Sequence, residues 1–129
     1  MLETVSDPLT ARPEVPRGQY LYAVIECDKE PVFGWAGIDG AAIRTVRDGR
    51  LAAVVSDAPK GKLRPERRRL AAHHETLKRL RKEFVVLPVA FGLVAENYAA
   101  VRQILVRNRE AFQEQIRRLA GKVEMGLRA

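Results

Sequence analysis

The sequence predicts a small α+β domain in which two long amphipathic helices cover one face of a mixed or mostly antiparallel sheet. We expect the element order β-β-β-α-β-α-β. Two β-rich runs flank the turn-forming pair Asp48 and Gly49, which favours a hairpin. Residues 65–83 and 97–119 each repeat apolar side chains at three- and four-residue spacing, which is typical of amphipathic helices. Hairpins combined with helical segments indicate one sheet with helices packed against it.

The first expected strand covers residues 19–27, where both alternating sets of side chains are apolar. A strand that is apolar on both faces is usually central in its sheet. Residues 28–40 follow as a loop that packs its own aromatic side chains among spaced glycines. Residues 1–18 contain three prolines and lack the pattern of a secretory signal, so we interpret them as a leader outside the domain.

The second and third strands are expected at residues 42–47 and 51–56, joined by the Asp-Gly turn. The first helix begins near Pro65, whose fixed φ suits the first helical position, and ends near residue 83. One stripe of this helix is expected to face the sheet. It consists of Leu70, His73, His74, Leu77, Leu80 and Phe84.

Residues 84–93 return to extended structure. Pro88 has no amide hydrogen to donate, so we expect it at a sheet edge or a bulge. A second helix over residues 97–119 is expected to end at Gly121. Residues 122–128 alternate apolar and charged side chains and predict a last strand. Because the sequence stops within this pattern, we expect the natural protein to continue into a second domain.

The composition favours acidic partners without selecting one. The 129 residues include 23 lysines and arginines against 16 acidic residues, which gives a formal net charge of +7 and a calculated pI of about 10.1. Nucleic acid, an anionic membrane and an acidic protein surface all fit this balance. No apolar stretch approaches the roughly 20 residues that cross a bilayer. The single cysteine, Cys27, fits a buried thiol in a reducing, cytoplasmic location.

No catalytic, cofactor or metal site is predicted. His73 and His74 are adjacent on a helix and point about 100 degrees apart, whereas helical zinc ligands prefer a spacing of three or four. We therefore expect both histidines to pack at the edge of the apolar stripe, with a metal or acid/base role as the alternative. No nucleophile, base and orienting group come together in the sequence, so an enzyme is the least favoured class.

Four arginines near the start of the first helix are the first candidate partner-binding group. Arg64, Arg67, Arg68 and Arg69 place positive charge at the positive end of the helix dipole, which costs a few tenths of a kcal/mol per exposed residue. One interpretation is a solvated, screened face, and the other is a docking patch for an acidic partner.

The second candidate group is the edge segment around Pro88. Phe91 and Gly92 follow this proline and could form an exposed apolar edge that accepts a strand or a helix of a partner. Ordinary core packing of Phe91 is the alternative interpretation.

Three segments resemble the GvpF/GvpL family of gas vesicle proteins, in matching order and spacing. They are LAAVVSDAP at 51–59, AHHETLKRL at 72–80 and VLPVAFGLVAE at 86–96. With shorter matches on either side, the resemblance covers residues 20–126. One departure is Ala90, where the family often has a basic residue, and any contact made by that residue is in doubt here.

The resemblance implies an α+β first domain of a two-domain accessory or minor structural protein of cytoplasmic gas vesicles. Such proteins are expected to bind the hydrophobic shell protein and other accessory proteins, and to support nucleation and assembly of the vesicle. The resemblance implies no enzymatic activity, cofactor, nucleic acid or lipid membrane. The alternative that the charge leaves open is a small basic nucleic-acid-binding domain, for which affinity would fall steeply with salt.

Overall fold

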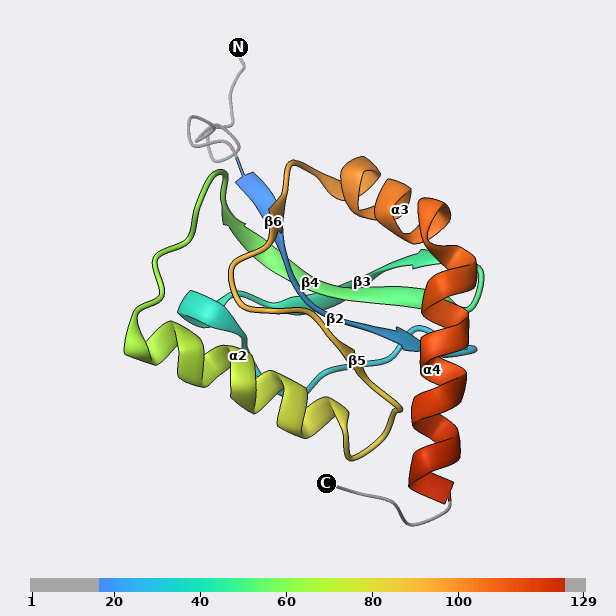
Figure 1. Cartoon of the computed structure of the whole chain (residues 1–129). Coiled ribbons are helices and arrows are strands. Elements are labelled where there is room, and N and C mark those ends of the chain that lie inside the picture. The colour runs from blue at the N-terminus through green and yellow to red at the C-terminus, as the bar shows by residue number, and fades with distance from the viewer. Residues whose placement is uncertain (1–16, 125–129) are drawn as a thin grey trace.

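The structure is a computed structural model that describes residues 17–124 (Figure 1). Its first strand begins at Arg17, and residues 1–16 of the expected leader lie outside the described part. The elements in chain order are β2 (Arg17–Glu26), η1 (Ile38–Gly40), β3 (Ile43–Asp48), β4 (Leu51–Pro59), α2 (Arg67–Leu80), β5 (Leu87–Pro88), β6 (Val94–Ala95), α3 (Tyr98–Arg107) and α4 (Arg109–Glu124).

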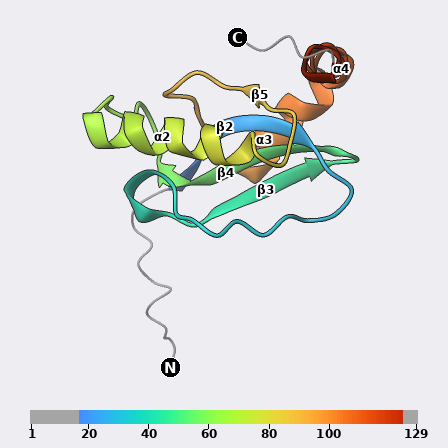
Figure 2. The ribbon, with the colours of Figure 1, turned by 90° about the horizontal axis from the view of Figure 1, so that it is seen from below.

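A five-stranded sheet forms the centre of the described residues. Its strand order is β3-β4-β2-β5, and β6 pairs with another part of β2. Every pairing is antiparallel. Figure 2 shows β3, β4, β2 and β5 side by side in that order. The predicted α+β class with one antiparallel sheet is therefore confirmed.

The predicted hairpin and edge strand are also confirmed. Asp48 pairs with Leu51, which leaves Gly49 and Arg50 as a two-residue loop between β3 and β4. Gly49 has a φ of 63° and takes the first loop position, which is the arrangement of a type II′ turn. Pro88 lies in β5 at the sheet edge, where its missing amide hydrogen costs no internal ladder bond.

The two faces of the sheet carry separate apolar clusters. One face contributes Tyr20, Tyr22, Ile25 and Val54, among others, to a cluster completed by α2. The opposite face contributes Leu21, Val24, Leu51, Ala53 and Val55 to a cluster completed by α3 and α4. Figure 1 shows α2 on one side of the strands and the other two helices across from it. The expectation that both helices cover the same face is wrong.

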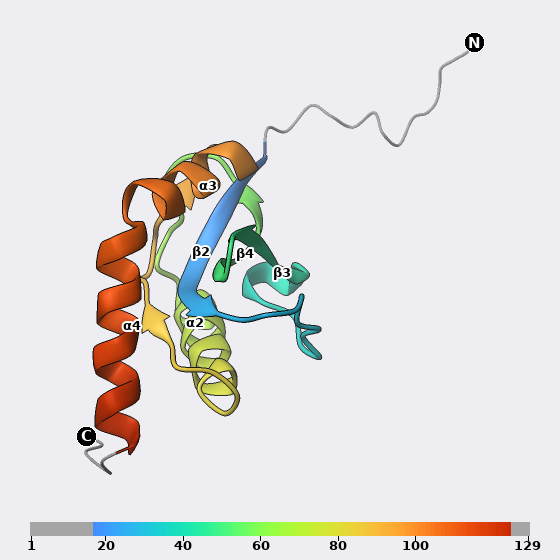
Figure 3. The ribbon, with the colours of Figure 1, turned by 90° about the vertical axis from the view of Figure 1, so that its right-hand side faces the viewer.

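The helix expected over residues 97–119 is two helices that meet at Asn108. Figures 1 and 3 both show a sharp change of direction between α3 and α4. The Asn108 side chain donates to the carbonyl of Ile104 at 2.8 Å, and its backbone φ of −111° leaves the helical range. An asparagine that bonds the last turn in this way caps the first helix and lets the next one begin in a new direction.

The expectation that the second helix ends at Gly121 is wrong. The expectation of a strand at 122–128 is wrong for residues 122–124, the part of this range that the structure describes. Helix α4 continues through Gly121 to Glu124, and residues 125–128 lie outside the described part. One glycine costs a helix only about 1 kcal/mol relative to alanine. Burial of Ile116, which is 4% exposed, and packing of Phe112 against the sheet hold α4 in place despite this cost.

No helix in the described part of the chain is long and apolar enough to cross a membrane.

Candidate protein-docking site

The arginines predicted as a docking patch lie around the start of α2, but they do not all face solvent. Glu66 takes the N-cap position in an extended conformation, and its side chain makes no capping hydrogen bond. Arg64, Arg67 and Arg68 are exposed, whereas the Arg69 side chain is only 17% exposed. The structure therefore separates Arg69 from the other three.

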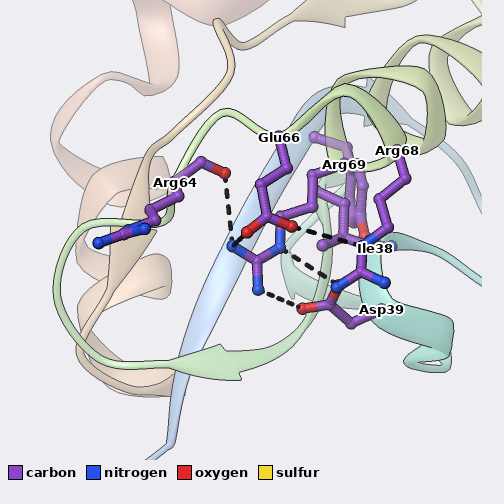
Figure 4. A network of polar contacts seen from close by, with 7 residues as sticks. Ile38, Asp39, Arg64, Glu66, Arg68 and Arg69 are labelled. Atoms are coloured by element: carbon purple, nitrogen blue, oxygen red, sulfur yellow. Dashed lines mark hydrogen bonds and ion pairs between the residues drawn. The ribbon is translucent and has the colours of Figure 1, made fainter.

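Arg69 connects α2 to the short helix η1. Its guanidinium donates to both carboxylate oxygens of Asp39, at 3.2 and 3.1 Å, and to the backbone carbonyl of Arg64 at 3.4 Å (Figure 4). Asp39 has a φ of 56°, in the left-handed region that non-glycine residues rarely adopt. The hydrogen bonds to Asp39 raise the pKa of Arg69. We infer that Arg69 holds this turn against α2 and that the fold, not a partner, uses its charge.

Arg68 makes a looser contact. Its Nε lies 3.4 Å from a carboxylate oxygen of Glu66, and its side chain remains 77% exposed (Figure 4). Exposed pairs of this kind contribute about 0–1 kcal/mol and exchange readily for contacts with a partner. Arg68 therefore remains available for docking, together with Arg64 and Arg67.

The edge segment, residues 87–95, lies along β2 in two short pieces. β5 pairs with Ala23 and Val24, β6 pairs with Gln19 and Tyr20, and residues 89–93 between them belong to neither strand. The backbone amide of Val89 donates to the backbone carbonyl of Tyr22, and the backbone amide of Leu21 donates to the backbone carbonyl of Leu93, both at 3.0 Å. Two-residue strands broken by a proline and a loop give a partner strand little to pair with.

Phe91 packs into the core, in agreement with the alternative interpretation of this residue. Its ring centroid lies 5.7 Å from that of Tyr20 and 5.8 Å from that of His73. Gly92, with a φ of 111°, donates its amide to the Tyr20 hydroxyl at 3.1 Å. The exposed residues of the edge segment are Pro88, Ala90 and Leu93, and Leu93 is 45% exposed.

A buried polar network beneath the edge segment was missed by sequence reasoning. Burial raises the pKa of Tyr20 to about 12, so its hydroxyl keeps its proton and can donate to Nδ1 of His73, 2.7 Å away. Burial also lowers the pKa of His73, which favours the neutral ring that this pattern requires. Interaction of the His73 ring with the backbone of Val89 opposes the effect of burial on the pKa of this histidine. The network joins β2, α2 and the edge segment.

The expectation that both histidines pack at the edge of the apolar stripe is right for His73 and wrong for His74. His73 is 2% exposed, whereas His74 faces solvent. Within residues 17–124, no three histidine, cysteine, aspartate or glutamate side chains gather as metal ligands would. Cys27 is buried, and its sulfur accepts from Arg47 at 3.5 Å. Burial raises the pKa of this thiol, which disfavours the reactive thiolate.

The sequence of residues 18–129 matches the profile of the family described as gas vesicle synthesis protein GvpL/GvpF. Gas vesicle protein F of Streptomyces sp. (strain CB03234) is 38% identical over 97 residues, which cover 75% of this chain and 40% of the relative.

Two solved structures share the fold. The crystal structure of the gas vesicle protein GvpF from Anabaena sp. PCC7120 has a TM-score of 0.70 at 29% identity. GvpF from Microcystis aeruginosa has a TM-score of 0.67 at 27% identity. Each comparison covers 81% of this chain and 44% of the solved protein. The chain thus spans less than half the length of these relatives.

Proposed function

This chain belongs to the GvpL/GvpF family of gas vesicle synthesis proteins, and we propose that it binds the hydrophobic shell protein and supports nucleation and assembly of the vesicle. The single observation that carries the proposal is the family match over residues 18–129, supported by the likeness to two GvpF structures. The family consists of gas vesicle proteins and is not a known enzyme family. We further propose that a second domain follows this one in the natural protein.

The proposed mechanism is reversible shielding of apolar surface on the shell protein before that protein is built into the wall. Shell subunits that must assemble through apolar surfaces aggregate if those surfaces meet too early. A domain that covers them weakly, and releases them to the growing shell, prevents this without consuming energy. We propose that it does so at the gas vesicle in the cytoplasm, together with other gas vesicle accessory proteins.

We assign shell-protein binding to the exposed part of the edge segment. Pro88 and Leu93 offer apolar surface on a segment that β2 and the buried network hold in place. The interrupted edge favours side-chain contacts with an apolar helix over addition of a strand. Phe91 and Gly92 support this surface from beneath and do not face the partner.

Co-expression of the tagged chain with the shell protein tests the proposal. The wild-type chain is expected to co-purify with the shell protein, and Leu93→Glu is expected to lose it. Val106→Glu is the matched control, because Val106 is 44% exposed, close to the 45% of Leu93, and lies on α3. Absence of shell protein from the wild-type preparation would reject the proposed binding, and equal loss in both variants would reject the assigned surface.

A further inference from the structure

We propose that the outer face of α2 is a docking surface for an acidic α-helix of a partner protein. The surface, which we call the basic ridge, consists of exposed side chains on α2 and directly beside its two ends: Arg64, Arg67, Arg68, Lys78, Arg81 and Lys82. The inference goes beyond the proposed function, because the ridge lies on a different element from the edge segment and would act whether or not that segment binds shell protein.

The net charge of the protein is concentrated in this one region. Residues 60–83 contain ten lysines and arginines and three glutamates, a formal charge of +7. The remainder of the chain has thirteen residues of each sign and is formally neutral. A uniformly solvated surface would not require such a concentration, whereas an oppositely charged partner is attracted and oriented by it.

The ridge follows the helix axis. Arg67 and Lys78 are 11 residues apart, which corresponds to about three turns and about 16 Å, so their side chains leave α2 on nearly the same side. Ala71 and His74 lie between them and are also exposed. Because Ala71 has a small side chain, another helix can approach the middle of the ridge closely while its carboxylates reach the cations at both ends.

Two basic residues of α2 are already engaged elsewhere and are not part of the ridge. Arg69 holds Asp39, as described above. Arg79 donates to Glu75 at 2.9 Å, and its guanidinium carbon lies 5.4 Å from the centroid of the Trp35 ring. Lys78 precedes Arg79 in the same turn, about 100 degrees around the helix, and is exposed.

The interspersed acids favour a protein partner over nucleic acid. Glu66, Glu75 and Glu83 are all exposed among the cations. They would repel a continuous row of phosphates, whereas a partner helix can meet them with uncharged or basic residues. Trp35, which lies beneath Arg79, is only partly exposed, so it does not offer the open aromatic face on which bases stack.

Two synthetic helical peptides of identical composition test the inference. In one, the glutamates form a single stripe that matches the ridge, and in the other they are spread around the helix. The 129-residue chain is titrated with each peptide, with duplex DNA of equal total charge and with phosphatidylglycerol vesicles, all at physiological salt. The striped peptide is expected to bind most tightly.

The double variant Arg67→Glu/Lys78→Glu is expected to weaken binding of the striped peptide by about tenfold. Its two changes act in opposite directions on the helix dipole, one in the first turn and one in the last, so the fold should be preserved. Arg117→Glu/Arg118→Glu on α4 is the matched control, with the same charge change at side chains that are 69% and 74% exposed.

The inference is supported if the wild-type chain and the control variant both prefer the striped peptide and the ridge variant does not. Equal binding of the two peptides, or an equal loss in the control, would overturn it. Tighter binding of DNA or of vesicles than of the striped peptide would also overturn it and assign the ridge to that ligand.

Discussion

Replacement of Gly37 by alanine should destabilise the protein, because there is no room for a β-carbon at this position. A Cβ on Gly37 would lie 2.2 Å from the hydroxyl oxygen of Tyr22, 3.0 Å from Cζ of the same ring and 3.1 Å from Cγ1 of Ile43. Tyr22 cannot move aside freely, since its hydroxyl contacts Ser56 at 2.7 Å and accepts from the amide of Ile38 at 2.9 Å. We expect a loss of about 2–3 kcal/mol, combining overpacking with loss of one buried hydrogen bond.

Urea denaturation followed by circular dichroism measures this loss as a lower midpoint at unchanged slope. Gly34→Ala is the matched control in the same loop, because nothing lies within 4 Å of its Cβ and its φ is not positive. That substitution should change stability by less than about 0.5 kcal/mol.

A double variant tests the assigned cause of the Gly37 effect. Tyr22→Phe alone should cost about 1–3 kcal/mol, because it leaves buried partners of the hydroxyl unsatisfied. In the double variant, Tyr22→Phe removes the hydroxyl with which the new Cβ would clash most closely. The double variant should therefore lose clearly less stability than the sum of the losses of the two single variants. A Gly37→Ala protein as stable as the wild type, or strictly additive costs, would refute the reasoning.

Three further changes probe the fold by urea denaturation. Arg67→Glu should stabilise the protein by about 0.3–1 kcal/mol, because it replaces a cation in the first turn of α2 by an anion that the helix dipole favours; a loss would contradict this. Asn97→Ala should cost about 1 kcal/mol, since the Asn97 side chain accepts from Ala100 at 2.8 Å and caps α3; an unchanged midpoint would argue against the cap. Burial lowers the pKa of His73, so the unfolded chain binds the proton more readily, and the free energy of unfolding should fall as pH drops below about 6.5. His73→Gln should be less pH-sensitive in this range, and an unaltered pH profile would exclude His73 as the source.

Local signals predicted those elements that depend on a few neighbouring residues. The Asp48 and Gly49 pair predicts a tight hairpin because glycine readily takes the positive φ that the turn needs, and the structure has this hairpin. Pro88 predicts an edge because it lacks a donor, and it lies in the edge strand β5.

The placement of the helices could not be predicted from their own amphipathicity. A helical stripe shows that one side is buried, but it does not show which face of a sheet buries it. The signal for the placement of the helices was in β2, where Tyr20 and Leu21 point to opposite faces and are both buried. A central strand that is apolar on both faces requires cover on both, which places α2 on one side and α3 and α4 on the other.

The sequence alone suggested the residues of the candidate site, and long-range contacts in the structure show how those residues are arranged. Arg64, Arg67 and Arg68 are exposed as a docking patch requires, but Arg69 pairs with Asp39, which is 30 residues away in the sequence. The bond between Tyr20 and His73 spans 53 residues and fixes the edge segment from beneath. Periodicity identifies neither contact, because each depends on how distant elements meet.

Light scattering of the shell protein, diluted from denaturant with and without this chain, tests the proposed shielding most directly. Scattering should fall as the wild-type chain or Val106→Glu is added in increasing amounts, and Leu93→Glu should have little effect. Unchanged aggregation of the shell protein at any concentration of the wild-type chain would contradict the proposal that this domain covers the apolar surface of its partner.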